Sequence, residues 1–267
     1  MPRWLTSMGA IAMLGLGCAS PSGAQGLLQH VDLASPEMST AEMTRAQVEA
    51  VIAAAAPAGH PDLAGKKLSG LDLSGLDLSG AMLRAAKLNK AKLNDAKLDR
   101  AILDQAWLVE ADLSRSSLKG ASLYAAQMQR ATLDNADLTG ARITADLTGA
   151  RLAGASLAGA NLGADMKNQS MGLIRAVLRS SNLERAVLRD ADLSRVDLEF
   201  ASLVHTDLTN ASLRGAALGG ANLTGATLVG TDFAGADVAS MRLVAPIGLD
   251  AARNLDKAQN IDRLLRK

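Results

Sequence analysis

Large apolar residues recur at every fifth position from about Leu63 to Leu243. Small residues, mostly alanine, stand two positions before most of them, and polar residues fill many of the other positions. On an α-helix a step of five residues advances about 500°, so these residues would not form one apolar stripe. In a flat strand an odd period would place every second leucine in solvent. The pattern therefore predicts a chain that turns in the same sense once per repeat, with the leucines sharing one interior.

The most regular leucines define the expected core. They include Leu83, Leu88, Leu93, Leu98, Leu103, Leu108, Leu113, Leu118, Leu193, Leu198, Leu203 and Leu208. Turn residues such as Ser74-Gly75 follow many of the central leucines, and glycine there can adopt a positive φ. Lys90, Asp95 and Arg100 occupy the same position in other repeats. We therefore expect a second turn type at those repeats, one that needs no positive φ.

Several repeats read alanine, aspartate or asparagine, leucine and two variable residues. The segments 111–115, 136–140, 191–195 and 221–225 follow this pattern directly. In these repeats the chain resembles the pentapeptide repeat family. The resemblance implies an all-β fold, a right-handed quadrilateral (four-sided) parallel β-helix solenoid with one repeat on each side. The repeats suffice for about nine coils, which would make a rod roughly 43 Å long at the ~4.8 Å spacing of neighbouring strands.

Two irregularities interrupt the repeat region 63–245. The step from Ile143 to Leu147 is four residues long, and the segment 163–177 fits the repeat poorly. That segment carries Lys167, Asn168 and Gln169 where a regular side is expected. An insertion in a solenoid leaves the coil as a loop or bulge. Because loops on rigid scaffolds often carry function, 163–177 is a candidate recognition feature; the alternative is an insertion that the rod merely tolerates.

The segment 25–62, before the repeats, is expected to form a linker and a capping helix. Ser39 and Glu42 have the spacing of a capping box, and strong helix formers follow from Thr40 to Ala56. We expect this helix to plug the open first coil, with partner binding as the alternative. Leucines at 71 and 76 replace the usual alanine, which indicates a wider first coil with something packed on it.

The segment 246–267, after the repeats, is expected to cap the other end. Pro246 ends the five-residue pattern, and the apolar spacing beyond Asn254 predicts an α-helix over 254–267. Such a cap would cover the last coil and prevent edge-to-edge growth of the solenoid.

The first 24 residues have the features of an export signal. Arg3 precedes an apolar stretch over 5–17, and a small-x-small cleavage motif ends at Ala24. The apolar stretch is too short to span a membrane. The alternative is a lipoprotein signal with lipidation at Cys18, the single cysteine of the chain. We therefore expect a periplasmic or secreted protein, or an outer-membrane lipoprotein.

Composition and charge narrow the possible partners. Aromatic residues make up 2% of the chain, as suits a narrow interior filled by leucine and alanine, and the formal net charge is +1. Such neutrality gives no support for long-range attraction to nucleic acid. One local excess of positive charge, here called the basic belt, consists of Arg84, Lys87, Lys90, Lys92, Lys97 and Arg100. Its plain interpretation is a solvated surface, and its alternative is contact with anionic lipid or polysaccharide.

The sequence offers no recognisable catalytic or metal-binding motif. His30, His60 and His205 are far apart, and neither a nucleophile elbow nor a phosphate-binding loop is present. Aspartates recur directly before the central residue, as at Asp72 and Asp112, where we expect them either to hydrogen-bond the turn backbone or simply to be solvated. We expect no cofactor and no metal.

These features favour a non-enzymatic, exported scaffold of the bacterial envelope that holds an unknown protein or envelope polymer. It would contact the membrane only through the possible lipid anchor. The alternative is a DNA mimic that binds DNA gyrase or topoisomerase, as quinolone-resistance members of the resembled family do. That resemblance implies a cytoplasmic protein with an acidic surface, whereas this chain has an export signal and a balanced charge.

Overall fold

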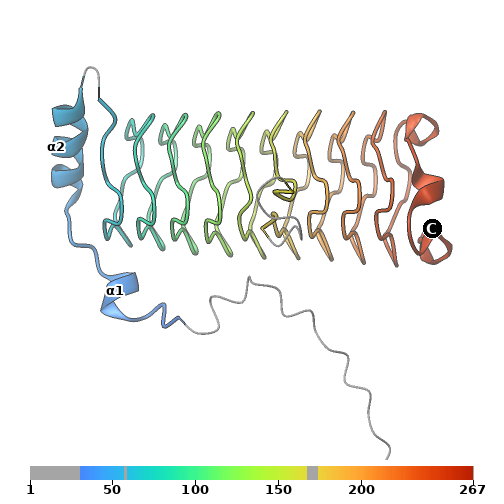
Figure 1. The fold of residues 1–267 in the computed structure, drawn as a ribbon, viewed down its shortest axis with the longest axis horizontal. Helices are drawn as coiled ribbons and strands as arrows, with labels where there is room; N and C mark the ends of the chain where they lie inside the picture. Colours follow the sequence, from blue (N-terminus) through green and yellow to red (C-terminus); the bar gives the residue numbers. More distant parts are fainter. Residues whose placement is uncertain (1–30, 57–58, 167–173, 267) are drawn as a thin grey trace, which may run out of the picture.

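The computed structural model describes residues 31–56, 59–166 and 174–266. They form a straight rod of stacked coils, with α-helices at its N-terminal end and short helical turns at its C-terminal end (Figure 1). The predicted export signal, Cys18, and Lys167, Asn168 and Gln169 lie outside the described residues. In the described part of the chain no helix is long and apolar enough to cross a membrane.

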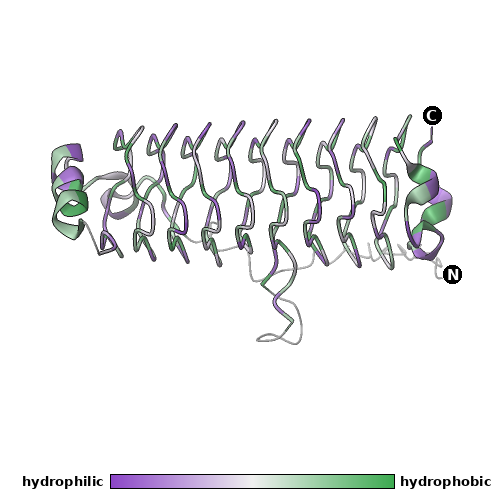
Figure 2. Ribbon diagram, turned by 90° about the horizontal axis from the view of Figure 1, so that it is seen from above, coloured by the Kyte–Doolittle hydropathy of each residue, from purple (hydrophilic) through white to green (hydrophobic). Residues whose placement is uncertain are grey.

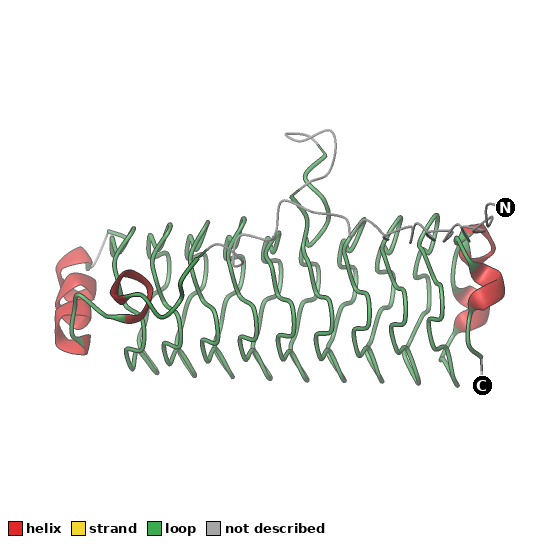
Figure 3. Cartoon of the chain, turned by 90° about the horizontal axis from the view of Figure 1, so that it is seen from below, coloured by secondary structure: helices red, strands yellow, loops and turns green. Residues whose placement is uncertain are grey.

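Single-residue parallel bridges join each coil to the next, so the coils appear as loops rather than strands in Figure 3. In the first coils the bridge partners are 20 residues apart, as in Asp72–Lys92 and Asp77–Lys97. Four repeats of five residues therefore complete one coil, and each repeat forms one of four sides. The column of bridges called here the Met82 column contains Asp62, Met82, Ile102, Ser122, Arg142, Asn161, Asp192, Ser212, Asp232 and Arg253.

The central leucines fill the interior of the rod. Each of the twelve ladder leucines named above is at most 1% exposed, and alanines such as Ala111 are equally buried beside them. Burial of one leucine side chain contributes roughly 1.5–3 kcal/mol. Because each coil packs mainly on its neighbours, these contributions accumulate along the rod. Hydrophobic and hydrophilic residues alternate along each coil in Figure 2.

A residue with positive φ occupies most corners of the coil, whether or not it is glycine. Lys90, Asp95 and Arg100 have φ values of 57°, 58° and 57°, and Gly140 has 67°. The expectation of a second turn type was therefore wrong. Left-handed backbone costs a residue with a side chain about 1–2 kcal/mol, and the burial of the neighbouring leucines offsets that cost.

The recurring aspartates stabilise the turns, as the sequence predicts. The Oδ1 atom of Asp112 accepts a hydrogen bond from the Ser114 N–H at 2.9 Å, and Asp72 accepts one from the Ser74 N–H at 3.1 Å. Asn222 does the same for Thr224 at 3.1 Å. A short acceptor in this position fixes the corner that follows it.

In the part of the chain described from residue 31 onward, two helices precede the rod, α1 (Pro36–Ser39) and α2 (Arg45–Ala55). The capping box is formed by Thr44 and Gln47, and the predicted box of Ser39 and Glu42 is not formed. Ser39 instead ends α1, where its hydroxyl donates to the Ser35 carbonyl at 2.8 Å. Because α1 ends there, the long helix begins at Arg45 rather than at Thr40.

Helix α2 covers the first coil. Val48 of this helix is fully buried in the leucine core, and Val51 and Ile52 pack against it. Leu71 and Leu76, which replace the usual alanines, are partly buried in the same cluster. The larger side chains in the first coil thus form part of the surface on which the helix packs.

The C-terminal segment forms a further coil instead of the predicted α-helix. Its bridge residues Ile247, Arg253, Gln259 and Leu265 follow at intervals of six. Three 3-10 helices connect them: η2 (Leu249–Ala251), η3 (Leu255–Lys257) and η4 (Ile261–Arg263). The sequence carries the signal, because Gly-Leu-Asp, Asn-Leu-Asp and Asn-Ile-Asp recur with this six-residue period from Gly248. An α-helix, with 3.6 residues per turn, could not supply bridges at that spacing.

Both irregularities of the repeat lie at one corner of neighbouring coils. The short step separates Arg142 from Asp146, and the insertion separates Asn161 from Val177. Arg142 pairs with Asn161 and Asp146 with Val177, so the two segments connect the same two columns of bridges. Asp146 and Val177 are 31 residues apart, against 20 for the first coils. The described ends of the insertion, residues 163–166 and 174–176, leave the side of the rod about midway along its length (Figures 2 and 3).

Candidate interaction surface

The two ends of the insertion are held together where they leave the rod. The Asp165 N–H donates to the Ile174 carbonyl at 3.1 Å, and the Ala176 N–H donates to the Leu162 carbonyl at 3.2 Å. Met166, the last described residue before the gap, is 42% exposed. The insertion therefore has a closed, hydrogen-bonded base.

A stack of three side chains attaches this base to the coil before it. The Arg142 guanidinium pairs with the Asp165 carboxylate at 2.9 Å and lies 4.8 Å from the centre of the Tyr124 ring. The Asp165 side chain is only 9% exposed. A cation over an aromatic face is attracted by the ring electrons, and the effect grows when the site is partly desolvated. This group, called here the Tyr124–Arg142–Asp165 stack, fixes the direction in which the insertion leaves the rod.

A buried polar network lies beside the short corner. The Gln129 amide donates to the Asp146 carboxylate at 2.7 Å and to the Gln127 side chain at 3.0 Å. Asp146 also accepts a bond from the Thr148 N–H at 3.0 Å. Gln127, Gln129, Thr144 and Asp146 are all buried, although corner and bridge positions elsewhere are mostly accessible. Gln129 Oε1 and Thr144 Oγ1 have no hydrogen-bond partner among the described residues, so this network is only partly satisfied.

Ion pairs between coils neutralise most of the basic belt. Five of its six members have an acidic partner: Arg84–Asp104 at 3.8 Å, Lys90–Glu110, Lys92–Asp72 and Lys97–Asp77 at 3.7 Å, and Lys87–Glu37 at 2.5 Å. In the first four pairs the partners are 20 residues apart, so the acidic residue lies on the preceding or the following coil. Such exposed pairs contribute little to stability, but they leave no continuous basic surface. The spacing of 20 in the sequence is the signal that could have identified them.

Helix α1 contributes the partner of Lys87. The Glu37 carboxylate pairs with Lys67 at 2.6 Å as well as with Lys87. Hydrogen bonds from these two ammonium groups lower the pKa of Glu37 to about 2. The Asn89 amide donates to the Met38 carbonyl at 3.1 Å and its oxygen accepts from the Val109 N–H at 3.1 Å. The N-terminal segment is thus held along the side of the first coils.

Arg100 is the exception in the basic belt. Among the residues that the structure describes, no carboxylate lies within ion-pairing distance of its guanidinium. It lines an open depression near the N-terminal end of the rod, which sequence reasoning did not predict. Within the described ranges, no three histidine, cysteine or acidic side chains come together as metal ligands.

Comparison with known families agrees with this architecture. The model for pentapeptide repeats matches the chain over residues 67–105, 106–144, 145–167, 173–210 and 206–239, with eight copies. The chain belongs to the pentapeptide repeat family, whose fold is a right-handed quadrilateral β-helix.

Several solved structures are similar to the chain. HetL, a pentapeptide repeat protein involved in heterocyst differentiation regulation from the cyanobacterium Nostoc sp. strain PCC 7120, is 27% identical over 83% of this chain and 99% of its own, with a TM-score of 0.37. A variant of QnrB1, a plasmid-mediated fluoroquinolone resistance protein, is 19% identical over 74% of this chain and 83% of its own, with a TM-score of 0.35. A pentapeptide repeat protein from the Arabidopsis thaliana thylakoid lumen is 26% identical over 49% and 68%, with a TM-score of 0.24. The comparison with curated proteins gave no significant match.

Proposed function

We propose that this protein is a non-catalytic scaffold of the bacterial envelope, and that its rod presents the segment 163–177 to another macromolecule. The observation that supports this most is the Tyr124–Arg142–Asp165 stack, which attaches the base of the insertion to the rod. An insertion that the fold merely tolerates needs no such attachment. Binding residues are often carried by loops that a rigid scaffold positions.

The remaining surface supports the same choice. Proteins of the pentapeptide repeat family are generally non-catalytic. The charged side chains of the coils are mostly paired with one another, so the insertion is the feature that departs most from the repeating surface. The alternative of a DNA mimic needs an acidic surface, whereas many acidic side chains of the described coils are paired with basic ones.

The recognition role can be tested by site-specific photocrosslinking in cells of the source organism. A photoreactive amino acid replaces Met166 at the base of the insertion or, as a control, Val229 on a regular corner; these residues are 42% and 40% exposed. We expect the Met166 position to form a crosslink to one macromolecule that the Val229 position does not form. Arg142→Gln in the Met166 background should reduce that crosslink, because it removes the ion pair and the ring contact that orient the base on the rod.

Two results would contradict the recognition role. One is equal crosslinking from both positions. The other is a Met166 crosslink that Arg142→Gln leaves unchanged while circular dichroism shows that the rod is intact.

The envelope location follows from the predicted export signal, and the mass of the protein recovered from fractionated cells tests it. A periplasmic chain that begins at Gln25, or a lipidated chain that begins at Cys18, would support the proposal. An uncleaved cytoplasmic chain would contradict it and would make protection of purified gyrase from a quinolone the next assay.

A further inference from the structure

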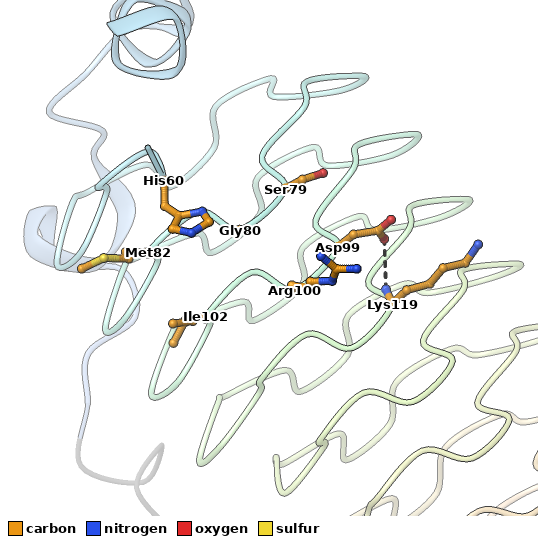
Figure 4. A pocket seen from close by; sticks show the side chains of 8 residues that line it. All are labelled: His60, Ser79, Gly80, Met82, Asp99, Arg100, Ile102 and Lys119. Atoms are coloured by element: carbon orange, nitrogen blue, oxygen red, sulfur yellow. Dashed lines mark hydrogen bonds between the residues drawn. The ribbon is translucent and has the colours of Figure 1, made fainter. Parts of the chain in front are cut away.

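An open depression lies at one corner of the rod near its N-terminal end (Figure 4). Its lining residues are His60, Ser79, Gly80, Met82, Asp99, Arg100, Ile102 and Lys119. They come from the segment before the first coil and from three successive coils. The depression is well separated along the chain from the insertion at 163–177.

Among the described residues, Arg100 has no ion-pair partner, and neither has the Asp99 carboxylate beside it in the depression. It occupies a left-handed corner with φ 57°, and the same corner of the coils before and after it holds Gly80 and Gly120. Glycine on both sides leaves the guanidinium without a neighbouring corner side chain. The Arg100 stem lies along the rod, with Cγ 3.8 Å from the position that a Gly120 Cβ would take.

Asp99 and Lys119, the charged residues beside Arg100, already have hydrogen-bond or ion-pair partners. Asp99 Oδ1 accepts hydrogen bonds from the Lys119 N–H at 3.1 Å and from the Ser117 hydroxyl. The Lys119 ammonium pairs with Asp137 on the following coil at 3.2 Å. The His60 imidazole lies against Gly80, on the side of Arg100 that faces away from Lys119 (Figure 4).

An apolar surface borders the charged one. Met82 and Ile102 are bridge partners on adjacent coils, and both are half-buried. Every other residue of the Met82 column is polar or charged. A guanidinium without an ion-pair partner and a two-residue apolar step therefore line one depression, and the imidazole lies at its other end, against Gly80.

We infer that this depression binds a small aliphatic carboxylate. The Arg100 guanidinium pairs with the carboxylate, and Met82 and Ile102 cover the aliphatic part. Guanidinium recognises carboxylates through two parallel hydrogen bonds. A fatty acid and an apolar residue at the C terminus of a peptide share this chemistry. The inference is independent of the recognition role proposed for 163–177.

The test is a titration of the purified protein followed by NMR of the Met82 and Ile102 methyl groups. The probes are octanoate, N-acetylleucine and, as a control without a carboxylate, N-acetylleucinamide. We expect saturable shifts of both methyl signals with at least one of the two carboxylates and none with the amide. Octanoate alone would indicate an acyl source, and N-acetylleucine alone a peptide C terminus.

Arg100→Gln should weaken carboxylate binding roughly tenfold, because a hydrogen-bonded charge is lost. Glutamine is compatible with this backbone, since Gln105 has φ 59° at another corner. Arg195→Gln is the matched control. Arg195 also occupies a left-handed corner, with φ 63°, and its Cγ lies 3.5 Å from the position of a Gly215 Cβ.

The inference is overturned if neither carboxylate gives a saturable shift. It is equally overturned if the amide binds as well as the acids, or if Arg100→Gln binds as tightly as the unchanged protein. A loss of binding in Arg195→Gln equal to that in Arg100→Gln would also exclude a specific role for this depression.

Discussion

A side chain at a left-handed corner leans over the same corner of the following coil. The Phe200 ring lies 2.6 Å from the position that a Cβ on Gly220 would take, and the Asn135 amide oxygen lies at the same distance from a Gly154 Cβ. Gly140 occupies the same corner as Gly120 of the preceding coil, and nothing lies within 4 Å of the position that a Gly140 Cβ would take. Glycine at a corner thus meets one of two needs, a positive φ alone or a positive φ together with space for the preceding corner side chain.

This difference predicts unequal costs for two chemically identical substitutions. Gly140→Ala should lower the free energy of unfolding by about 1–2 kcal/mol, because alanine is strained in left-handed backbone. Gly220→Ala should cost about 1 kcal/mol more, because the Phe200 ring must leave its preferred rotamer. Urea unfolding of both variants measures the two costs.

The double variant Phe200→Ala/Gly220→Ala provides the control. The Phe200 side chain is 63% exposed, so its truncation alone removes little packing. We expect the cost of Gly220→Ala in that background to fall to the level of Gly140→Ala. Equal costs for the two single substitutions would show that the corner side chains do not need the space.

At this scale the sequence predicted the buried leucines and the role of the aspartates, because both follow from the repeat alone. It did not predict positive φ at Lys90 and Arg100. Propensity argues against that conformation for such residues, and only the hydrogen bonds and burial on either side of the corner impose it. The ion pairs were missed because they depend on the residue one coil away.

At the scale of elements, the C-terminal coil depends on asparagines that combine two functions. Asn254 and Asn260 have φ 56° before η3 and η4, and their amides donate to Asp232 and Asp237 at 2.8 and 2.7 Å. Burial tends to raise the pKa of Asp232, but hydrogen bonds from Asn254, the Ala234 N–H and Arg214 outweigh it and hold that pKa below its ordinary value. Each asparagine thus sets a turn and joins the last coil to the one before it.

Two substitutions at Asn254 separate these functions. Asn254→Gly keeps the left-handed turn and removes the hydrogen bond, so we expect a loss of about 1 kcal/mol. Asn254→Ala removes the hydrogen bond and adds the strain of positive φ, so we expect a loss of about 2–3 kcal/mol. Thermal unfolding and hydrogen exchange of the last coil measure both. A glycine variant as unstable as the alanine variant would contradict the assignment of two functions.

Sequence reasoning placed a helix over the first coil and a cap at the other end, but it was wrong about where the N-terminal helix begins and about the helical form of the C-terminal cap. At the N-terminal end two possible capping boxes lie five residues apart, and tertiary contacts of α1 decide between them. At the C-terminal end the apolar spacing of Leu255, Ala258 and Ile261 fits a helix, while the six-residue repeat that begins at Gly248 fits a coil. The preceding coil presents bridging groups at fixed positions, and only the coil can pair with them.

At the scale of the molecule, acid should weaken the rod through aspartates distributed along its length. Hydrogen bonds from the hydroxyl and N–H of Ser74 and Ser79 hold the pKa values of Asp72 and Asp77 below their ordinary range. Partial burial tends to raise the pKa values of Asp137 and Asp207, but hydrogen bonds from Thr139 and Thr209 and from nearby basic side chains outweigh it and lower both pKa values. Groups with a lowered folded pKa stabilise the protein above the unfolded pKa, about 3.9, and this contribution is lost as the pH falls through the folded value.

We therefore expect the urea midpoint to be nearly constant from about pH 7 to 5 and to fall below about pH 4. Asp72→Asn/Asp77→Asn should reduce the fall, since asparagine keeps the turn hydrogen bond, as Asn222 does, but does not titrate. A decline that begins above about pH 5 would show that groups other than these aspartates control acid stability.

The whole rod was the most predictable feature of the molecule, because one five-residue pattern repeated in register allows a single solution. The candidate surface was less predictable. The sequence identified 163–177 as irregular, but the stack that attaches it requires Tyr124 and Arg142, which lie far from it in the chain. The depression at Arg100 depends on glycines at the same corner of two other coils, and the five-residue pattern alone does not relate residues 20 positions apart.

The fixed length of one coil makes the rod a ruler. A transplanted block of 20 residues within the regular coils would return the chain to the same corner and add about 4.8 Å to the length. Arg100 and the insertion would then keep their directions around the axis while the distance between them grew by one step. A block of five or ten residues would rotate everything beyond it to another side. Whole-coil duplications can therefore change the spacing of two surface features without changing either of them.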